Sequence, residues 1–128
     1  MNKSGILRLV ILALPFVLCV GVWIVESQTN LFRRIYDDVI LDNRNHYLTC
    51  KQLPSEDEVL RVMAAHPDTL AKIQQINPGF VGAEMDTISC PDRADILFWY
   101  GTHQDRLMIE SIINDDTFYG IPYRLENR

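Results

Sequence analysis

The feature that most constrains this chain is an almost uncharged apolar run near its N-terminus. The run extends from Ile6 to Val25, reads ILRLVILALPFVLCVGVWIV, and contains Arg8 as its only charged residue. Twenty residues at the α-helical rise span roughly 30 Å, which matches the hydrocarbon core of a bilayer. We therefore expect one membrane-spanning helix, with a small globular domain behind it.

A retained anchor is the favoured interpretation of this run, and two alternatives stand beside it. A cleaved signal peptide has an apolar stretch of about 7–15 residues and a small-x-small cleavage site. The uncharged core from Leu9 to Val25 has 17 residues, and only a poor cleavage site follows it, after Ser27. A lipoprotein signal needs a small residue before its cysteine, whereas Leu18 precedes Cys19.

The charges on either side of the run predict its orientation. Lys3 and Arg8 lie on the N-terminal side without any acidic residue, whereas Arg33 and Arg34 on the other side are soon followed by two aspartates. Cytoplasmic flanks of membrane helices carry the excess of basic residues. The N-terminus is therefore predicted to be cytoplasmic, and the C-terminal domain periplasmic or extracellular.

The part of the chain behind the apolar run is acidic. Residues 26–128 contain all 17 acidic residues and 10 of the 12 basic ones, which gives a formal charge of −7. A domain of this charge without a basic stripe is a poor candidate for binding nucleic acid or an anionic membrane surface. About one hundred residues suffice for one small domain.

Two cysteines, Cys50 and Cys90, lie outside the apolar run. An even pair in an oxidising compartment predicts a disulfide, which would stabilise the fold by roughly 4 kcal/mol. The alternative is a pair of buried free thiols in a cytoplasmic domain. A zinc site is disfavoured because the chain has no C-x-x-C pair and its three histidines are scattered. We expect neither a metal nor a cofactor.

An amphipathic helix is predicted over residues 28–46, directly behind the anchor. Its apolar stripe recurs at three- and four-residue spacing and consists of Leu31, Phe32, Ile35, Tyr36 and Val39. The favoured interpretation is that this stripe packs on the chain's own domain, and the alternative is that it packs on a partner. Neither Pro nor Gly separates this helix from the anchor, so the sequence allows the two to form one long continuous rod of helix.

Three more helices and a short sheet are predicted beyond it. Ser55 and Glu58 have the spacing of a capping box for a helix to residue 66, a second helix follows over 67–76, and Thr102 caps a third over 103–114. A strand over 106–113 is the alternative to the last of these. Residues 80–90 and 118–125 are predicted strands, and the apolar run 94–100 (ADILFWY) is predicted to be a central strand buried on both faces. Pro122 confines the last predicted strand to an edge or to irregular structure.

The predicted fold class is α+β: one transmembrane helix and a small disulfide-stapled domain, in which helices precede a sheet of about three strands. A mainly helical domain is the alternative. The predicted divisions are residues 1–27 for the N-terminus and anchor, 28–47 for the juxtamembrane helix and 48–128 for the extracytoplasmic domain.

No motif in the sequence predicts catalysis. His103 as a general base and Asp115-Asp116 as a cation site are both weaker interpretations than exposed polar residues. Four aromatic residues are instead candidate contacts for a protein partner, namely Trp99, Tyr100, Tyr119 and Tyr123. The leading hypothesis is a non-catalytic, membrane-anchored subunit of a larger membrane complex. The alternatives are an extracytoplasmic inhibitor or immunity protein and a small hydrolase with an unrecognised site.

Overall fold

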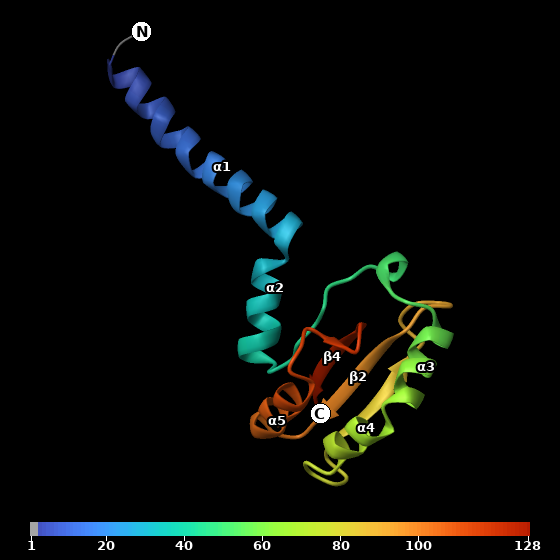
Figure 1. Ribbon diagram of the computed structural model, residues 1–128. Helices are drawn as coiled ribbons and strands as arrows, with labels where there is room; N and C mark the ends of the chain where they lie inside the picture. The colour runs from blue at the N-terminus through green and yellow to red at the C-terminus, as the bar shows by residue number, and fades with distance from the viewer. Residues whose placement is uncertain (1–2) are drawn as a thin grey trace. The chain divides into compact units, whose positions relative to one another are not determined.

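The computed structural model describes residues 3–128, with side chains from residue 13 onward, and the chain forms two compact units (Figure 1). The first unit ends at Ile35 and contains the helices α1 (Lys3–Thr29) and α2 (Leu31–Ile35). Asn30 separates them with a positive φ of 51°, which an α-helix cannot accommodate. The prediction of one long continuous rod is therefore wrong.

The apolar run begins outside the described side chains, because those of residues 6–12 are not described. Among the described residues, no helix is by itself long and apolar enough to cross a membrane. Ala13–Thr29 and Leu31–Ile40 meet the length and composition requirements together, as a bent pair.

The second unit, Tyr36–Arg128, is an α+β domain with a disulfide. With α1 and α2, the described chain contains five α-helices and a four-stranded sheet. The elements of the second unit are the π-helical turn η1 (Tyr36–Ile40), the 3₁₀ turn η2 (Cys50–Gln52), α3 (Glu56–Ala65), α4 (Pro67–Gln74), β1 (Gly82–Asp86), β2 (Asp95–Tyr100), α5 (His103–Ile113), β3 (Thr117–Phe118) and β4 (Ile121–Asn127).

The sheet has the order β1-β2-β4-β3, so that β2 is central, as its continuous apolar sequence predicts. β1 pairs with β2 antiparallel, whereas β4 pairs with β2 in parallel over a five-residue ladder, Ile96–Tyr100 against Tyr123–Asn127. Parallel neighbours require a crossover connection, and α5 provides it.

The three helices that follow η2, namely α3, α4 and α5, pack on one face of this sheet. The core on this face joins one side chain each from α3, α4 and α5 (Val59, Ile73 and Ile109) to alternate residues of β2 and β4. The strand residues of this core are Ile96, Phe98, Tyr100, Ile121, Tyr123 and Leu125. The opposite face of the sheet receives no helix from this core, and its residues need other partners.

The C-terminal segment is a hairpin and not the single edge strand that Pro122 predicts. Tyr119 and Gly120 both have positive φ, 51° and 90°, which is the backbone of a two-residue type I′ turn. The turn returns the chain from β3 to β4 and brings the sheet to four strands instead of about three. The pairing of β4 with β2 begins at Tyr123, one residue after Pro122. The missing N–H of Pro122 therefore interrupts no hydrogen bond between these two strands.

The predicted boundaries of the three helices beyond residue 50 are largely confirmed, whereas the helix predicted over 28–46 is interrupted at Asn30 and ends at Ile40. The hydroxyl of Ser55 accepts from the Glu58 N–H, and Thr102 and Asp105 form a reciprocal capping box. Residues 106–113 belong to α5, so the alternative strand over them is wrong. The first predicted strand is shorter than expected, since β1 covers only Gly82–Asp86 of the predicted 80–90.

Cys50 and Cys90 form the predicted disulfide, with their Cα atoms 5.4 Å apart. It joins η2 to the connection between β1 and β2. Disulfides form and persist in oxidising compartments, which indicates an extracytoplasmic or secreted location for this domain.

Gly82 lies beneath the indole of Trp99, its partner in the β1–β2 ladder. A Cβ at this position would come within 2.3 Å of the Trp99 ring, and only a shift of the strand or of the indole could relieve the clash. Gly82→Ala is expected to lower the free energy of unfolding by roughly 1–3 kcal/mol, as overpacking does, and to alter the Trp99 fluorescence. Chemical denaturation of the full chain in detergent measures both.

Gly101→Ala is the matched control, because a Cβ there would lie 3.7 Å from the nearest atom, the Cβ of Phe80. Its stability should stay close to that of the wild type. Equal losses in the two variants would show that the contact between Gly82 and Trp99 is not tightly packed.

Candidate functional site

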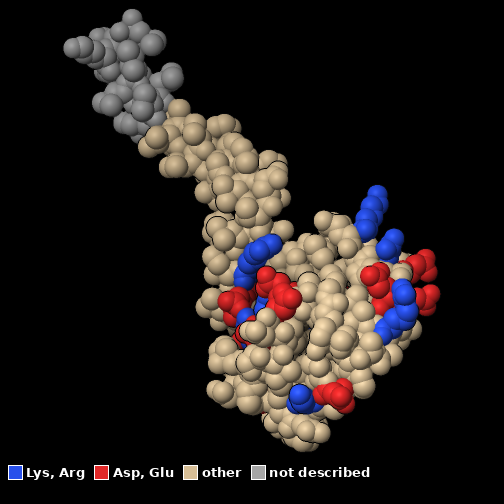
Figure 2. All heavy atoms as spheres, in the orientation of Figure 1, with Lys and Arg blue, Asp and Glu red and all other residues tan. Residues whose placement is uncertain are grey.

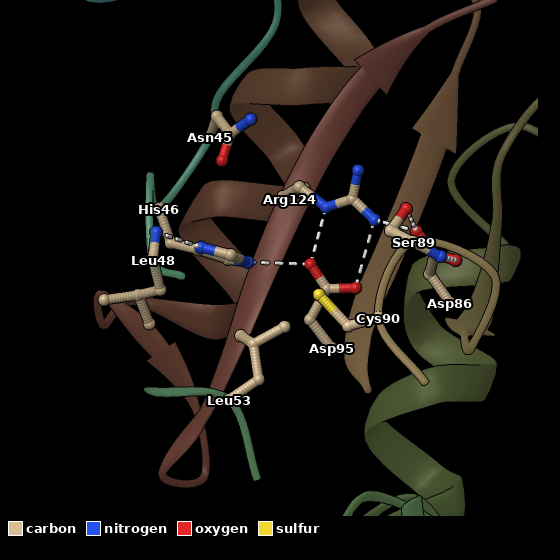
Figure 3. Close-up of a pocket in the computed structure, with 9 residues that line it drawn as sticks. All are labelled: Asn45, His46, Leu48, Leu53, Asp86, Ser89, Cys90, Asp95 and Arg124. Atoms are coloured by element: carbon tan, nitrogen blue, oxygen red, sulfur yellow. Dashed lines mark hydrogen bonds and ion pairs between the residues drawn. The ribbon is translucent and has the colours of Figure 1, made fainter. Parts of the chain in front are cut away.

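The face of the sheet opposite the helices carries a network of charged residues centred on Arg124 of β4 (Figure 3). Its Nε donates to Asp95 Oδ2 at 2.5 Å, and its Nη2 donates to Asp95 Oδ1 at 3.1 Å. The same Nη2 also donates to Asp86 of β1. Arg124 therefore connects three neighbouring strands through two carboxylates.

His46 completes this network from the segment that precedes the disulfide. Its Nε2 lies 2.7 Å from Asp95 Oδ2, and its Nδ1 lies 2.9 Å from the backbone nitrogen of Leu48. Because the Leu48 N–H can only donate, Nδ1 accepts and Nε2 carries the proton that it donates to Asp95. The hydrogen bonds thus assign one neutral tautomer to His46, with both ring nitrogens in use.

The environment of the two aspartates keeps both ionised. Burial by itself would raise the pKa of Asp95, but hydrogen bonds from His46 and Arg124 hold it below the ordinary value of 3.8. Burial acts in the same direction on Asp86, and hydrogen bonds from Ser89, the Ile88 N–H and Arg124 outweigh it and lower the pKa to about 2.

The network borders a cavity of about 130 Å³ next to the disulfide. Leu48, Leu53 and Cys90 form its apolar wall, and the charged groups form the other (Figure 3). No buried side-chain nitrogen or oxygen lacks a hydrogen-bond partner within the described part of the chain. The buried polar atoms are thus satisfied within the domain, and the ion pairs of the network hold the sheet to the segment around His46.

A second charged cluster surrounds Arg106 of α5, whose side chain is 8% exposed. The guanidinium donates to Asp38, to Asp42 at 2.9 Å and to Glu110 at 3.2 Å. His103 lies at the edge of this cluster, with its Nδ1 2.7 Å from Asp42 Oδ1. The cluster joins the start of the second unit to α5.

This second cluster is also satisfied internally. Burial would raise the pKa of Asp42, but hydrogen bonds from His103 and Arg106 lower it below 3.8. Burial and the nearby Asp42 raise the pKa of the Tyr100 phenol, which stays protonated and donates to the Asp42 carbonyl. His103 does not line the cavity beside the disulfide, and no described serine, threonine or cysteine hydrogen bonds to it.

Asp115 and Asp116, considered for a cation site, lie beside Glu110 but apart from Asp105. Asp105 caps α5 and accepts from Asn77, whereas Asp115 and Asp116 border a separate open hollow of about 340 Å³ with Arg44 and Glu110. Arg44 occupies its acidic side, 2.6 Å from Asp116 Oδ1. No group of three or more potential ligands is arranged around a metal position within the described residues.

The four aromatic residues predicted as partner contacts separate into two classes. Tyr100 and Tyr123 are buried in the core, where Tyr123 packs edge-on against Phe98 at a centroid distance of 5.7 Å. Trp99 is half-buried on the opposite face of the sheet. Tyr119 is exposed at the hairpin turn and stacks on His66, with ring centroids 3.5 Å apart. Trp99 and Tyr119 are therefore the two that present surface to a partner.

The charged networks were not found from the sequence, although one signal for them exists. Asp95 interrupts the apolar run ADILFWY, and a charged residue in a strand buried on both faces requires a partner. The signal does not identify that partner, because Arg124 and His46 are 29 and 49 positions away.

Comparisons of the chain with protein-family models, with curated proteins and with solved structures find no match.

Arg124→Met is expected to lower the free energy of unfolding by about 3 kcal/mol, because it leaves two aspartates on a covered face without their counter-charge. Arg128→Met is the control, since its pairs with Glu84 and Glu126 are almost half exposed and should contribute less than about 1 kcal/mol. Chemical denaturation of both variants in the full chain measures the difference. Similar small losses in both would mean that Arg124 does not hold the sheet together.

Acid should destabilise the domain through Asp86. The pKa of Asp86 is about 2 in the folded chain against an ordinary 3.8. The contribution of its ionised carboxylate to the free energy of unfolding is therefore complete above roughly pH 4 and is lost as the pH falls towards 2. Asp86→Asn removes this contribution and should flatten the decline in stability across that range. Asp92→Asn, at an exposed turn, should retain the wild-type decline.

Proposed function

We propose that this protein is a non-catalytic, single-pass membrane subunit whose disulfide-bonded domain acts outside the cytoplasm through protein contacts. Its membrane anchor comprises the apolar run Ile6–Val25. This chain is then one component of a larger membrane complex.

The observation that carries the proposal is the exposed apolar surface of α1. From Ala13 to Val25 the helix contains no charged residue, and Phe16 and Trp23 are each 71% exposed. Figure 2 accordingly shows the described part of this helix as a surface without acidic or basic atoms on the face in view. Apolar exposure on this scale requires a covering, and lipid is the covering that matches the length of the run.

The polar groups that follow this surface support the same placement. Ser27 Oγ donates to the Ile24 carbonyl at 2.8 Å, and Thr29 Oγ1 donates to the Val25 carbonyl at 2.7 Å. The Glu26 carboxylate accepts from the Phe32 N–H at 2.7 Å. Polar side chains that bond their own backbone in this way can lie at the edge of an apolar medium without an unmet hydrogen bond.

The fate of the reactive side chains supports a non-catalytic role. Cys50 and Cys90 are in the disulfide, both nitrogens of His46 are in use, and the exposed His103 is bound to Asp42. Neither histidine is placed to activate a described nucleophile. The function is therefore assigned to surfaces.

One observation favours a second candidate function, a binding module for a basic protein. Asp115, Asp116 and Glu110 border the same open hollow, and the side chain of Asp116 is 93% exposed. The domain as a whole is acidic, and a basic partner would be attracted to it in a salt-dependent way.

The orientation can be tested with a membrane-impermeant thiol reagent on intact cells. In a Cys19→Ala background, the reagent is expected to label Cys50 and Cys90 only after reduction, because the domain faces outward and the disulfide protects both thiols. Labelling without reductant would show that the disulfide is absent. Labelling that requires broken cells would reverse the orientation.

The complex can be tested by gentle detergent extraction and native mass measurement. We expect a mass larger than that of the chain, and we expect exchange of residues 6–25 for an unrelated anchor to weaken the association. A monomer in detergent whose exported residues 28–128 bind a basic protein in a salt-dependent way would favour the second candidate and contradict the first.

A further inference from the structure

The first segment of the second unit, Tyr36–Leu41, presents its apolar side chains away from the domain. Val39 is 70% exposed and Ile40 is 65% exposed, and the side chains of Tyr36 and Leu41 are exposed as well. We refer to these four residues as the apolar collar. The prediction that this part of the stripe packs on the chain's own domain is wrong.

The acidic residues of the same segment explain this orientation. Asp37 accepts from the Tyr47 hydroxyl at 2.5 Å, Asp38 accepts from Arg106, and Asp42 accepts from Arg106 at 2.9 Å. These bonds hold the polar side of the segment against the domain. An ordinary surface helix has the opposite arrangement, with its apolar side on the core.

The backbone separates the two sides further. The Leu41 N–H bonds to the Tyr36 carbonyl five residues earlier, which closes a π-helical turn. Such a turn contains more than the 3.6 residues of an α-helical turn, so that each residue rotates the chain by less. The smaller rotation brings Leu41 closer to Tyr36 and Ile40 around the helix axis than an α-helical turn would.

We propose that the apolar collar lies in the headgroup layer of the membrane that anchors the chain, with Val39 and Ile40 against the acyl boundary. This inference rests on the proposed function, because it takes α1 as the anchor. It extends that function by seating the domain on the bilayer along a second, interfacial contact.

The chain between the anchor and the collar is short enough to allow this contact. Tyr36 follows Val25 by 11 residues, which as a straight helix would rise roughly 17 Å, beyond the headgroup layer. Asn30 interrupts the helix with its positive φ, so that the chain can turn along the membrane plane. The residues after that break, Leu31, Phe32 and Ile35, are exposed apolar side chains of the first unit.

The composition of the collar fits lipid better than a protein partner. It consists of three aliphatic residues and one tyrosine, whose amphipathic ring suits the headgroup layer. Its neighbouring carboxylates are already bonded within the domain, so that seating it in the interface leaves no carboxylate of the segment without a partner. The acidic domain is no ligand for anionic lipid, and the contact is therefore apolar and should form on zwitterionic membranes.

The test uses the full chain with Cys19→Ala, reconstituted in phosphatidylcholine vesicles and spin-labelled at one added cysteine. Val39→Cys reports on the collar, Val17→Cys reports on the anchor, and Ile88→Cys is the matched control, since Ile88 is an aliphatic residue of the same domain that is 94% exposed. Power saturation with oxygen, which dissolves in lipid, and with a water-soluble nickel chelate compares the two environments at each site.

The ratio of oxygen to nickel accessibility is expected to be several-fold higher at residues 39 and 17 than at residue 88. A water-like ratio at 39 together with a lipid-like ratio at 17 would overturn the collar contact and leave the anchor intact. Exclusion of both reagents at 39 would show a protein partner or a second copy in place of lipid. A water-like ratio at 17 would overturn the proposed function itself.

Discussion

The rest of the second unit depends on the pairing of Arg124 with two carboxylates on the face of the sheet that carries no helix. A four-stranded sheet with helices on one side must cover its other side with something else. Here Asp95 lies in the central strand on that side, and its burial is tolerated only because Arg124 and His46 both bond to it. The pairing also links three neighbouring strands, since Arg124 on β4 reaches Asp95 on β2 and Asp86 on β1.

The same requirement explains the irregular segment between η1 and the disulfide. Residues 42–53 take no part in a helix layer, yet they close the open side and the free edge of the sheet. Arg44 exchanges two backbone hydrogen bonds of 2.9 Å with Leu125, and His46 reaches Asp95. The disulfide then fixes the end of this segment to the β1–β2 connection, so that the covering cannot separate from the sheet without unfolding.

Local patterns in the sequence predicted local structure well and predicted contacts between distant residues poorly. The capped helices, the disulfide and the buried central strand each follow from residues close together or from a single pair of cysteines. The hairpin was missed because its turn is Tyr119-Gly120, which lacks the Asn-Gly or Asp-Gly signal, and because Pro122 suggested an edge. The stripe of residues 28–46 misled for a different reason. Its periodicity correctly indicated an apolar and a polar side. Periodicity does not show which of the two sides packs against the domain, and the hydrogen bonds of Asp37 and Asp38 place the polar side there. The candidate site was the part least predictable from the sequence, since each of its ion pairs joins residues far apart in the chain.

His46 with Asp95 and His103 with Asp42 have the hydrogen-bond distances of catalytic histidine–aspartate pairs. Their surroundings indicate a structural role for both. A catalytic histidine oriented by a carboxylate keeps its second nitrogen available for a proton from a nucleophile. In His46 the Leu48 N–H occupies that nitrogen, so protonation there would break a bond that holds the covering segment. In the other pair, Asp42 is shared between His103 and Arg106, whose charge already compensates the carboxylate. Both pairs therefore connect the segment 37–48 to the domain, one to the sheet and one to α5. The ion pairs of the domain therefore hold that segment in place, while Tyr36, Val39 and Ile40, the apolar residues of the domain that follow the anchor most closely, remain exposed.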